Sequence, residues 1–331
     1  MDEQLARGAV AAALRTVRPG VAMSLDGLVL TALHWDAVRE PAYETAGAAL
    51  AAGELDLREQ GSGTVLAIEA ATKSRPVVIF AGDTVVGGRQ NRIINVTVWL
   101  PAGAVTPIPV SCLEHGRWDS GYRFTTSRKV DYGLRAEVSR HLADAAAWEV
   151  RAAGAGPGPR RSYAADQGRV WGEISAREMR AGAHSPTAAL HDVYDREAGD
   201  VGAIASAFPC PAGASGVAVG IGGRLVALEL FDAESTLTEQ WPRLAEAAAS
   251  AHADHRRLVA AGAVPPSPHR YPDSGALGRM LSRAVGAAAT AVVGRSAGEG
   301  LDVRLAGHRV RGGALVVAGR PVHVELFRAA D

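Results

Sequence analysis

The strongest constraint on the fold is a repeated segment in the second half of the chain. Residues 216–231 align without gaps on residues 312–327, and half of the aligned positions are identical, including a central Gly-Arg and a final Glu-Leu-Phe. In each copy, two runs of strand-forming residues flank a two-residue turn in which glycine supplies a positive φ. The repeat therefore predicts two antiparallel hairpins that arose by duplication.

Two earlier segments, 23–30 and 77–86, resemble these hairpins more loosely. Four hairpins of one kind predict a mostly antiparallel sheet system. Because short hairpins also resemble one another by chance, we assign duplication to the last two copies only.

Helical periodicity fills the middle of the chain. Residues 134–152 carry apolar side chains at helical spacing, and Asp166 can cap a following helix. Ser185-Pro186 predicts the start of a third helix, Thr236 to Glu239 a capping box for a fourth, and Ser274 the start of a last one. Runs of strands, then helices, then strands predict an α+β fold rather than a doubly wound sheet.

Two stretches rich in Gly and Pro, 153–160 and 263–272, predict linkers or long loops. The first divides the chain into a strand-rich part, residues 1–152, and a part with helices and both repeated hairpins, residues 161–331. Whether the two parts pack as one unit stays open at this point.

Composition limits the classes of function. Hydrophobic residues make up 47% and charged residues 21% of the chain, as in an ordinary globular protein. The formal net charge is zero, so we expect neither nucleic acid nor a membrane as a partner. The longest uncharged apolar run is too short to span a bilayer. We expect a cytoplasmic protein, with oligomer formation left open.

The polar segment 83–118 carries the chemistry that the sequence offers. It contains both asparagines of the chain, Asn91 and Asn95, in a sequence that has also lost nearly all its lysines. Strand alternation over residues 92–100 places the two asparagines on one face, where they bind a ligand or satisfy turn backbone. The predicted ligand-binding residues are Asp83, Gln90, Asn91, Arg92, Asn95, His115, Arg117 and Trp118.

Two residues in the segment are candidates for catalysis. Glu114 is the first, as a carboxylate that acts as acid or base, and Cys112 is the second, as a nucleophile. A lone strand cysteine is more often a small buried hydrophobic residue. Asp166, Gln167 and His323 are secondary candidates. No spacing of His, Cys, Asp or Glu forms a recognised metal set, and no phosphate loop or cofactor motif identifies a cofactor.

The polar segment resembles the ARPP domain family in two runs, residues 82–95 and 109–118. The resemblance continues through residues 166–171 and 216–231 and covers nearly the whole chain. The family is named for its association with ADP-ribosylglycohydrolases and rhodanese-phosphatase proteins. This implies a connection with ADP-ribose or NAD-derived metabolites, without catalytic residues to carry over.

Three hypotheses of function follow. The first is an enzyme that acts on a small anionic metabolite, nucleotide- or ADP-ribose-derived, by hydrolysis or group transfer. In it Arg92 and Arg117 hold the anion and Glu114 transfers a proton. The second is a small-molecule-binding or sensor domain that uses the same residues without turnover. The third is an oligomer or protein-interaction module anchored by Trp99 and Trp118.

Overall fold

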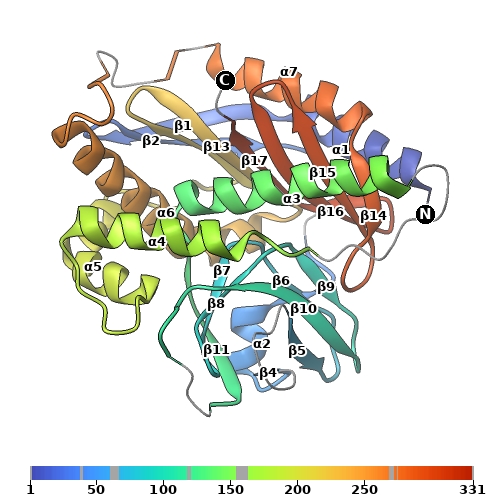
Figure 1. Ribbon diagram of the computed structural model, residues 1–331. Coiled ribbons are helices and arrows are strands. Elements are labelled where there is room, and N and C mark those ends of the chain that lie inside the picture. The colour runs from blue at the N-terminus through green and yellow to red at the C-terminus, as the bar shows by residue number, and fades with distance from the viewer. Residues whose placement is uncertain are drawn as a thin grey trace.

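The computed structural model describes residues 2–37, 40–59, 67–117, 121–153, 163–267, 272–273 and 275–329. An eight-stranded antiparallel sheet forms its centre, in the order β1-β2-β12-β13-β17-β16-β15-β14 (Figure 1). The strands are β1 (Arg18–Leu25), β2 (Leu28–His34), β12 (Gly216–Ile221), β13 (Arg224–Phe231), β14 (Val292–Arg295), β15 (Leu301–Gly307), β16 (Val310–Val317) and β17 (Arg320–Arg328).

The sheet has the same arrangement on both sides of its centre. Helix α1 (Glu3–Thr16) precedes β1 and helix α7 (Ala276–Ala289) precedes β14. Each half of the sheet therefore has four strands, and a helix comes before the first of them in the chain. The two repeated hairpins, β12–β13 and β16–β17, occupy equivalent places, and β13 pairs with β17 at the centre. This arrangement supports duplication of a unit larger than the hairpin alone.

Both repeated hairpins turn as the sequence predicts. The turn residues are Gly222 and Gly223 in the first hairpin and Ala318 and Gly319 in the second, and all four have positive φ, between 48° and 83°. Positive φ at both central residues defines a type I′ turn, whose twist matches that of the flanking strands. The hairpin within residues 23–30 is also confirmed, as β1–β2.

A closed six-stranded barrel is inserted between β2 and β12, in the order β10-β5-β4-β11-β7-β8. The barrel strands are β4 (Leu55–Glu59), β5 (Ala67–Thr72), β7 (Asp83–Gly87), β8 (Arg92–Ile94), β10 (Val105–Cys112) and β11 (Arg123–Lys129). Three short strands, β3 (Glu44–Thr45), β6 (Val77–Ile79) and β9 (Val98–Leu100), form a separate sheet. In the large sheet, β1 and β2 come from residues 1–152 and the other six strands from residues 161–331, so this sheet takes strands from both sides of the predicted division of the chain.

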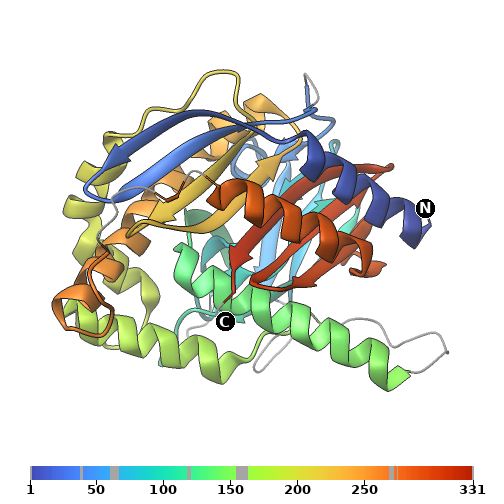
Figure 2. The same cartoon turned by 90° about the horizontal axis from the view of Figure 1, so that it is seen from above.

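Helices cover both faces of the large sheet. Helices α1 and α7 pack together on one face (Figure 2), where apolar side chains of both helices and of the sheet form one core. The opposite face packs against the barrel insert and against α3 and α6. The remaining helices are α2 (Ala46–Ala51), α3 (Tyr132–Ala153), α4 (Gln167–Ala181), α5 (Leu190–Ser206) and α6 (Glu234–Ala260). None of the helices in the described ranges has the length and apolar character needed to cross a membrane.

The α+β class with mostly antiparallel strands is confirmed, but two of the strand predictions are wrong. Residues 77–86 do not form a hairpin, because β6 pairs with β3 and β9, whereas β7 belongs to the barrel. The strand predicted over residues 92–100 is interrupted at residues 95–97. There Asn95 binds the backbone of Tyr163 and Thr97 accepts from the amide of Ala81, so both side chains replace strand pairing with tertiary hydrogen bonds.

The predicted caps are partly confirmed. Asp166 caps α4, with its carboxylate accepting from the Arg169 amide at 3.1 Å. Ser185 does not begin a helix directly, since α5 starts at Leu190. Thr236 to Glu239 is not a capping box, because α6 starts at Glu234 and the Thr236 and Glu239 side chains instead bind the segment that leads into the barrel. The predicted start at Ser274, and residues 154–160 of the first linker, lie outside the described residues.

A further hydrogen bond between the segment before the barrel and the end of β13 involves a carboxyl group whose pKa is raised. Tyr43, in the segment before the barrel, donates a 2.5 Å hydrogen bond to Asp232, which directly follows β13. Asp232 is 8% exposed, and burial raises its pKa to about 6. The protonated carboxyl is therefore favoured in the folded protein more than in the unfolded chain.

We expect an Asp232→Asn variant to change how stability depends on pH. In the wild type the raised pKa of this carboxyl contributes about 2–3 kcal/mol to the free energy of unfolding. This contribution is fully present below about pH 4 and is lost as pH rises through about 6. Asparagine does not titrate, so the variant gains stability relative to the wild type between pH 4 and pH 7.5. Urea unfolding at a series of pH values measures this difference, and a constant difference across that range contradicts it.

Candidate functional site

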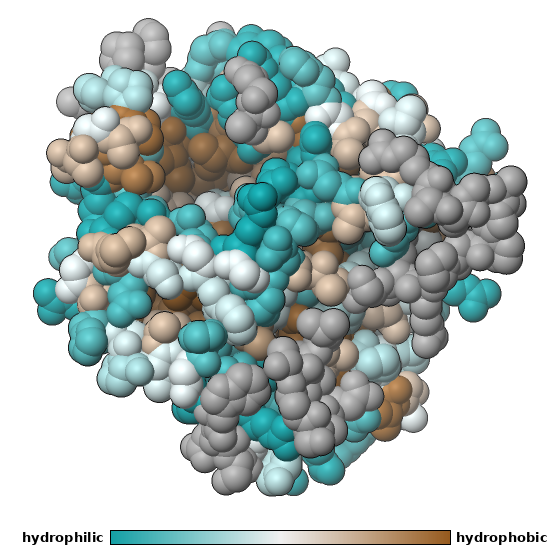
Figure 3. All heavy atoms as spheres, viewed as in Figure 1, coloured by the Kyte–Doolittle hydropathy of each residue, from teal (hydrophilic) through white to brown (hydrophobic). Residues whose placement is uncertain are grey.

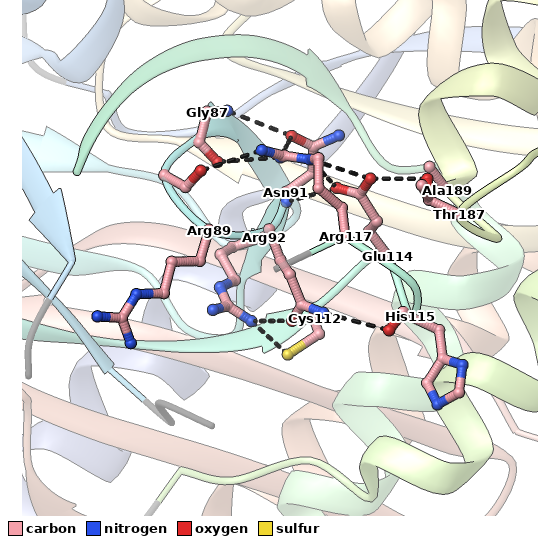
Figure 4. Close-up of polar contacts among 12 residues, drawn as sticks. Gly87, Arg89, Asn91, Arg92, Cys112, Glu114, His115, Arg117, Thr187 and Ala189 are labelled. Carbon is pink, nitrogen blue, oxygen red and sulfur yellow. Dashed lines mark hydrogen bonds and ion pairs between the residues drawn. The ribbon is translucent and has the colours of Figure 1, made fainter. Parts of the chain in front are cut away.

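Two candidate regions lie apart from each other: the polar segment at one end of the barrel and a cavity beside the large sheet. The polar segment brings together several of the predicted residues (Figure 4). The carboxylate of Glu114 is 3% exposed and lies at the centre of this cluster. It accepts hydrogen bonds from Arg117 Nε at 3.0 Å, from Thr187 Oγ1 at 2.7 Å and from the Asn91 amide at 3.2 Å. Both of its oxygens are thus used within the protein.

Asn91 and Arg117 hold the loop that follows β7. Asn91 Oδ1 accepts from the Gly87 amide at 3.2 Å and from Arg117 Nη2 at 3.1 Å. Arg117 also donates to the carbonyl oxygens of Gly87, at 3.2 Å, and Gly88, at 3.0 Å. All three nitrogens of the Arg117 guanidinium therefore donate to acceptors within the protein, which favours the loop-holding role of Asn91 over a ligand-binding one.

Arg92 lies inside the end of the barrel rather than on its surface. Its side chain is fully buried, forms an ion pair with Glu59 at 3.3 Å, and donates to Gln90 Oε1 at 3.0 Å and to the sulfur of Cys112. Burial raises the pKa of the Cys112 thiol, despite the opposing effect of Arg92, so the thiol is not activated as a nucleophile. Gln167 closes this end by two 2.8 Å hydrogen bonds with the Cys112 backbone.

Three of the remaining predicted residues, Asp83, Asn95 and His323, do not join this cluster. Asp83 and His323 lie at the interface of the barrel and the sheet, where Asp83 pairs with Lys129 at 3.1 Å and His323 contacts Thr97 and Glu229. Asn95 binds Tyr163 and Ser111. His115 is exposed beside Trp171. Trp118 lies outside the described residues. Across the described part of the chain, no three His, Cys, Asp or Glu side chains gather in a metal-binding arrangement.

A cavity of about 750 Å³ lies away from the polar segment. It is bounded by the β12–β13 turn, the first residues of α3, the last turns of α6 and residues 264–267. Apolar side chains gather in this hollow in the upper left of the space-filling view (Figure 3). The apolar lining residues include Ile221, Val226, Leu258, Val264 and Pro265.

A few polar groups also line this cavity. Asp131 and Asp254 are each neutralised, by Arg177 at 2.7 Å and by Arg180 at 2.8 Å. The imidazole of His255 packs against the turn, where a Cβ on Gly222 would lie only 2.3 Å from His255 Nε2. Burial lowers the pKa of His255, so its imidazole is neutral at pH 7.

A second cavity of about 210 Å³ adjoins the first. The two share Gly223, Arg224 and Arg328. The smaller one is otherwise lined by residues of α7, by Asp273 before that helix, by Leu225 of β13 and by Arg309 between β15 and β16. Its walls are strongly basic, whereas those of the larger cavity are mostly apolar.

Sequence comparison places the whole chain in one group of proteins. Residues 16–327 match the ARG and Rhodanese-Phosphatase-superfamily-associated Protein domain, ARPP-1. The chain belongs to this family. Comparison with curated proteins and with solved structures gave no significant match.

The ARPP-1 match spans the barrel and the large sheet, and it contains the polar segment and all lining residues of the two cavities except Arg328 and Ala329. In this ARPP-1 chain the polar segment is recognisable from the sequence because rare residue types concentrate there. His255 and the arginines of the smaller cavity are not among the predicted site residues. The one sequence signal near them, the Gly222-Gly223-Arg224 turn, predicts a hairpin and no binding site.

Proposed function

We propose that this protein binds a small organic metabolite in the 750 Å³ cavity beneath the β12–β13 turn. The observation that carries the proposal is the combination of volume and lining. Ligand-binding cavities of roughly 300–1,000 Å³ are mostly apolar and contain a few polar groups that orient the ligand. Here the apolar walls are interrupted by the neutral imidazole of His255 and by two cations, Arg224 and Arg328. The two cations favour an anionic ligand.

The contacts of the polar segment support a structural role instead. A ligand or substrate that used Glu114 or Arg117 would have to replace hydrogen bonds that hold the loop at residues 87–91. Buried polar groups that lose their partners cost about 1–3 kcal/mol each. Binding at the cavity requires no such exchange, because its apolar walls have no internal hydrogen bonds to lose.

Hydrolysis or group transfer is the second candidate function, and His255 favours it. A neutral imidazole in a cavity wall is suited to accept a proton from a nucleophile or water. In this proposal the general base is His255 rather than Glu114. The metabolite class stays a small anion, and the association in the family's name implies that it is nucleotide- or ADP-ribose-derived.

We expect an Ala251→Trp variant to block the cavity. Ala251 belongs to α6 and lines the cavity, so an indole at this position occupies the space where a ligand would lie. The neutral fluorescent probe N-phenyl-1-naphthylamine should bind the wild type, and its affinity should fall at least about tenfold in the variant, a loss of about 1.4 kcal/mol.

The matched control is Ala203→Trp, which adds the same side chain at an exposed position of α5. Both variants are first compared with the wild type by circular dichroism and urea unfolding. If the probe binds a folded Ala251→Trp variant and the wild type equally well, the cavity is not the binding site.

A further inference from the structure

The smaller cavity is lined by five arginines that come from four separate places in the chain. Arg224 follows the β12–β13 turn, Arg279 and Arg283 belong to α7, Arg309 lies between β15 and β16, and Arg328 ends β17. Among the described residues, the lining contains one carboxylate, that of Asp273, and it is already paired with Arg279. The cavity wall therefore carries an excess of positive charge.

Ion pairs among the described residues do not account for the charge of three of these arginines, Arg224, Arg283 and Arg328. Arginine stays protonated at every physiological pH, so the guanidinium groups repel one another. Within the described residues, neither Arg224, Arg283 nor Arg328 forms an ion pair, although the chain as a whole has as many acidic as basic residues. A basic cluster in a neutral protein indicates an anion that is supplied from outside.

The number and chemistry of the cations favour a phosphate over a carboxylate. Guanidinium groups bind phosphate oxygens in pairs, and several can surround one phosphate because its oxygens point in different directions. The first residue of α7, Ala276, also lines the cavity, so the positive end of a 14-residue helix dipole adds to the potential. A singly charged carboxylate would leave most of this positive charge uncompensated.

We propose that the smaller cavity is a subsite for a phosphate or diphosphate group that carries at least two negative charges. The larger cavity holds the rest of the same molecule, because both cavities share Gly223, Arg224 and Arg328. The ligand class is thus an organic phosphate with an apolar or aromatic body. This inference adds a phosphate subsite to the proposed function, and it rests on that function for the placement of the organic part of the ligand in the larger cavity.

Calorimetric titration of the full chain with inorganic pyrophosphate tests the subsite. We expect binding by the wild type and at least tenfold weaker binding by an Arg279→Ala/Arg283→Ala variant. Both arginines line only the smaller cavity, and alanine preserves the helix in which they lie. The control is Arg15→Ala/Arg196→Ala, which removes the same charge from exposed positions elsewhere and should bind within twofold of the wild type.

Probe and pyrophosphate results separate this inference from the proposed function. If the wild type binds N-phenyl-1-naphthylamine but not pyrophosphate, the phosphate subsite is overturned and the larger cavity remains a binding site. If pyrophosphate binds and the neutral probe does not, the subsite stands without the proposed function. Equal pyrophosphate affinity in the wild type and the Arg279→Ala/Arg283→Ala variant places the anion elsewhere and overturns the inference.

Two organic diphosphates then distinguish the sources of the group. ADP has an aromatic and polar body, whereas geranyl diphosphate has a purely aliphatic one. We expect at least one of them to bind at least tenfold more tightly than pyrophosphate, with that gain abolished by Ala251→Trp. If neither diphosphate binds more tightly than pyrophosphate, the inference that one ligand occupies both cavities is overturned.

Discussion

Replacing Arg135 with methionine is expected to lower the free energy of unfolding by about 3–5 kcal/mol. Arg135 is 2% exposed and binds two carboxylates, Glu229 and Glu325, the latter at 3.0 Å. These glutamates lie directly opposite each other at the β13–β17 pairing. Without the guanidinium, two buried like charges would face each other across neighbouring strands. Urea unfolding at pH 7 measures the loss.

The pKa of Glu229 supports this expectation. Burial alone would raise it, yet the cations of Arg135 and Lys129 hold the pKa of Glu229 well below its ordinary value. The matched control is an Arg135→Met/Glu229→Gln/Glu325→Gln variant, which removes the cation and both anions together. We expect it to recover most of the lost stability, because removing these three buried charges together costs far less than leaving the two carboxylates without Arg135. A loss below about 1 kcal/mol in the single variant would show that the cation is not required.

Replacing Arg92 with methionine is expected to cost about 3 kcal/mol of stability. The side chains of Arg92 and Glu59 are both fully buried at the end of the barrel. Methionine fills a similar volume but leaves the Glu59 carboxylate without its cation. Thermal and urea unfolding of the purified variant measure the effect, since both report loss of the native barrel.

An Arg92→Met/Glu59→Gln variant separates a structural role of Arg92 from a ligand-binding one. If Arg92 only supports the barrel, the double variant is nearly as stable as the wild type and binds pyrophosphate equally well. If Arg92 holds an anionic ligand, as the sequence alone suggests, the stable double variant loses pyrophosphate affinity. That second outcome would return the ligand site to the polar segment.

The sequence predicts local structure where neighbouring residues decide it. Type I′ turns need positive φ at two adjacent positions, and Gly222-Gly223 meets that need wherever the hairpin lies. The cap at Asp166 depends on residues within one helical turn. The same local reasoning failed for Thr236, whose hydroxyl contacts Tyr43, because a distant partner replaced the local one.

The polar segment shows the limit of reading chemistry from residue types. Glu114, Cys112 and Arg92 are the side chains that an active site uses, and they do lie close together. Their partners, Thr187 and Glu59, come from distant parts of the chain, and nothing in the local sequence identifies them. Burial by those partners is what favours a structural role over a catalytic one.

The α+β class, the repeated hairpins and most of the helices are predictable from the sequence, since they depend on periodicity and turn residues within short windows. Long-range packing set the closure of the barrel, its insertion into the sheet and the pairing of β13 with β17. It also gathered Arg224, Arg283 and Arg328 around one cavity. Such contacts join residues far apart in the chain, and burial of shared apolar surface selects them among many alternatives.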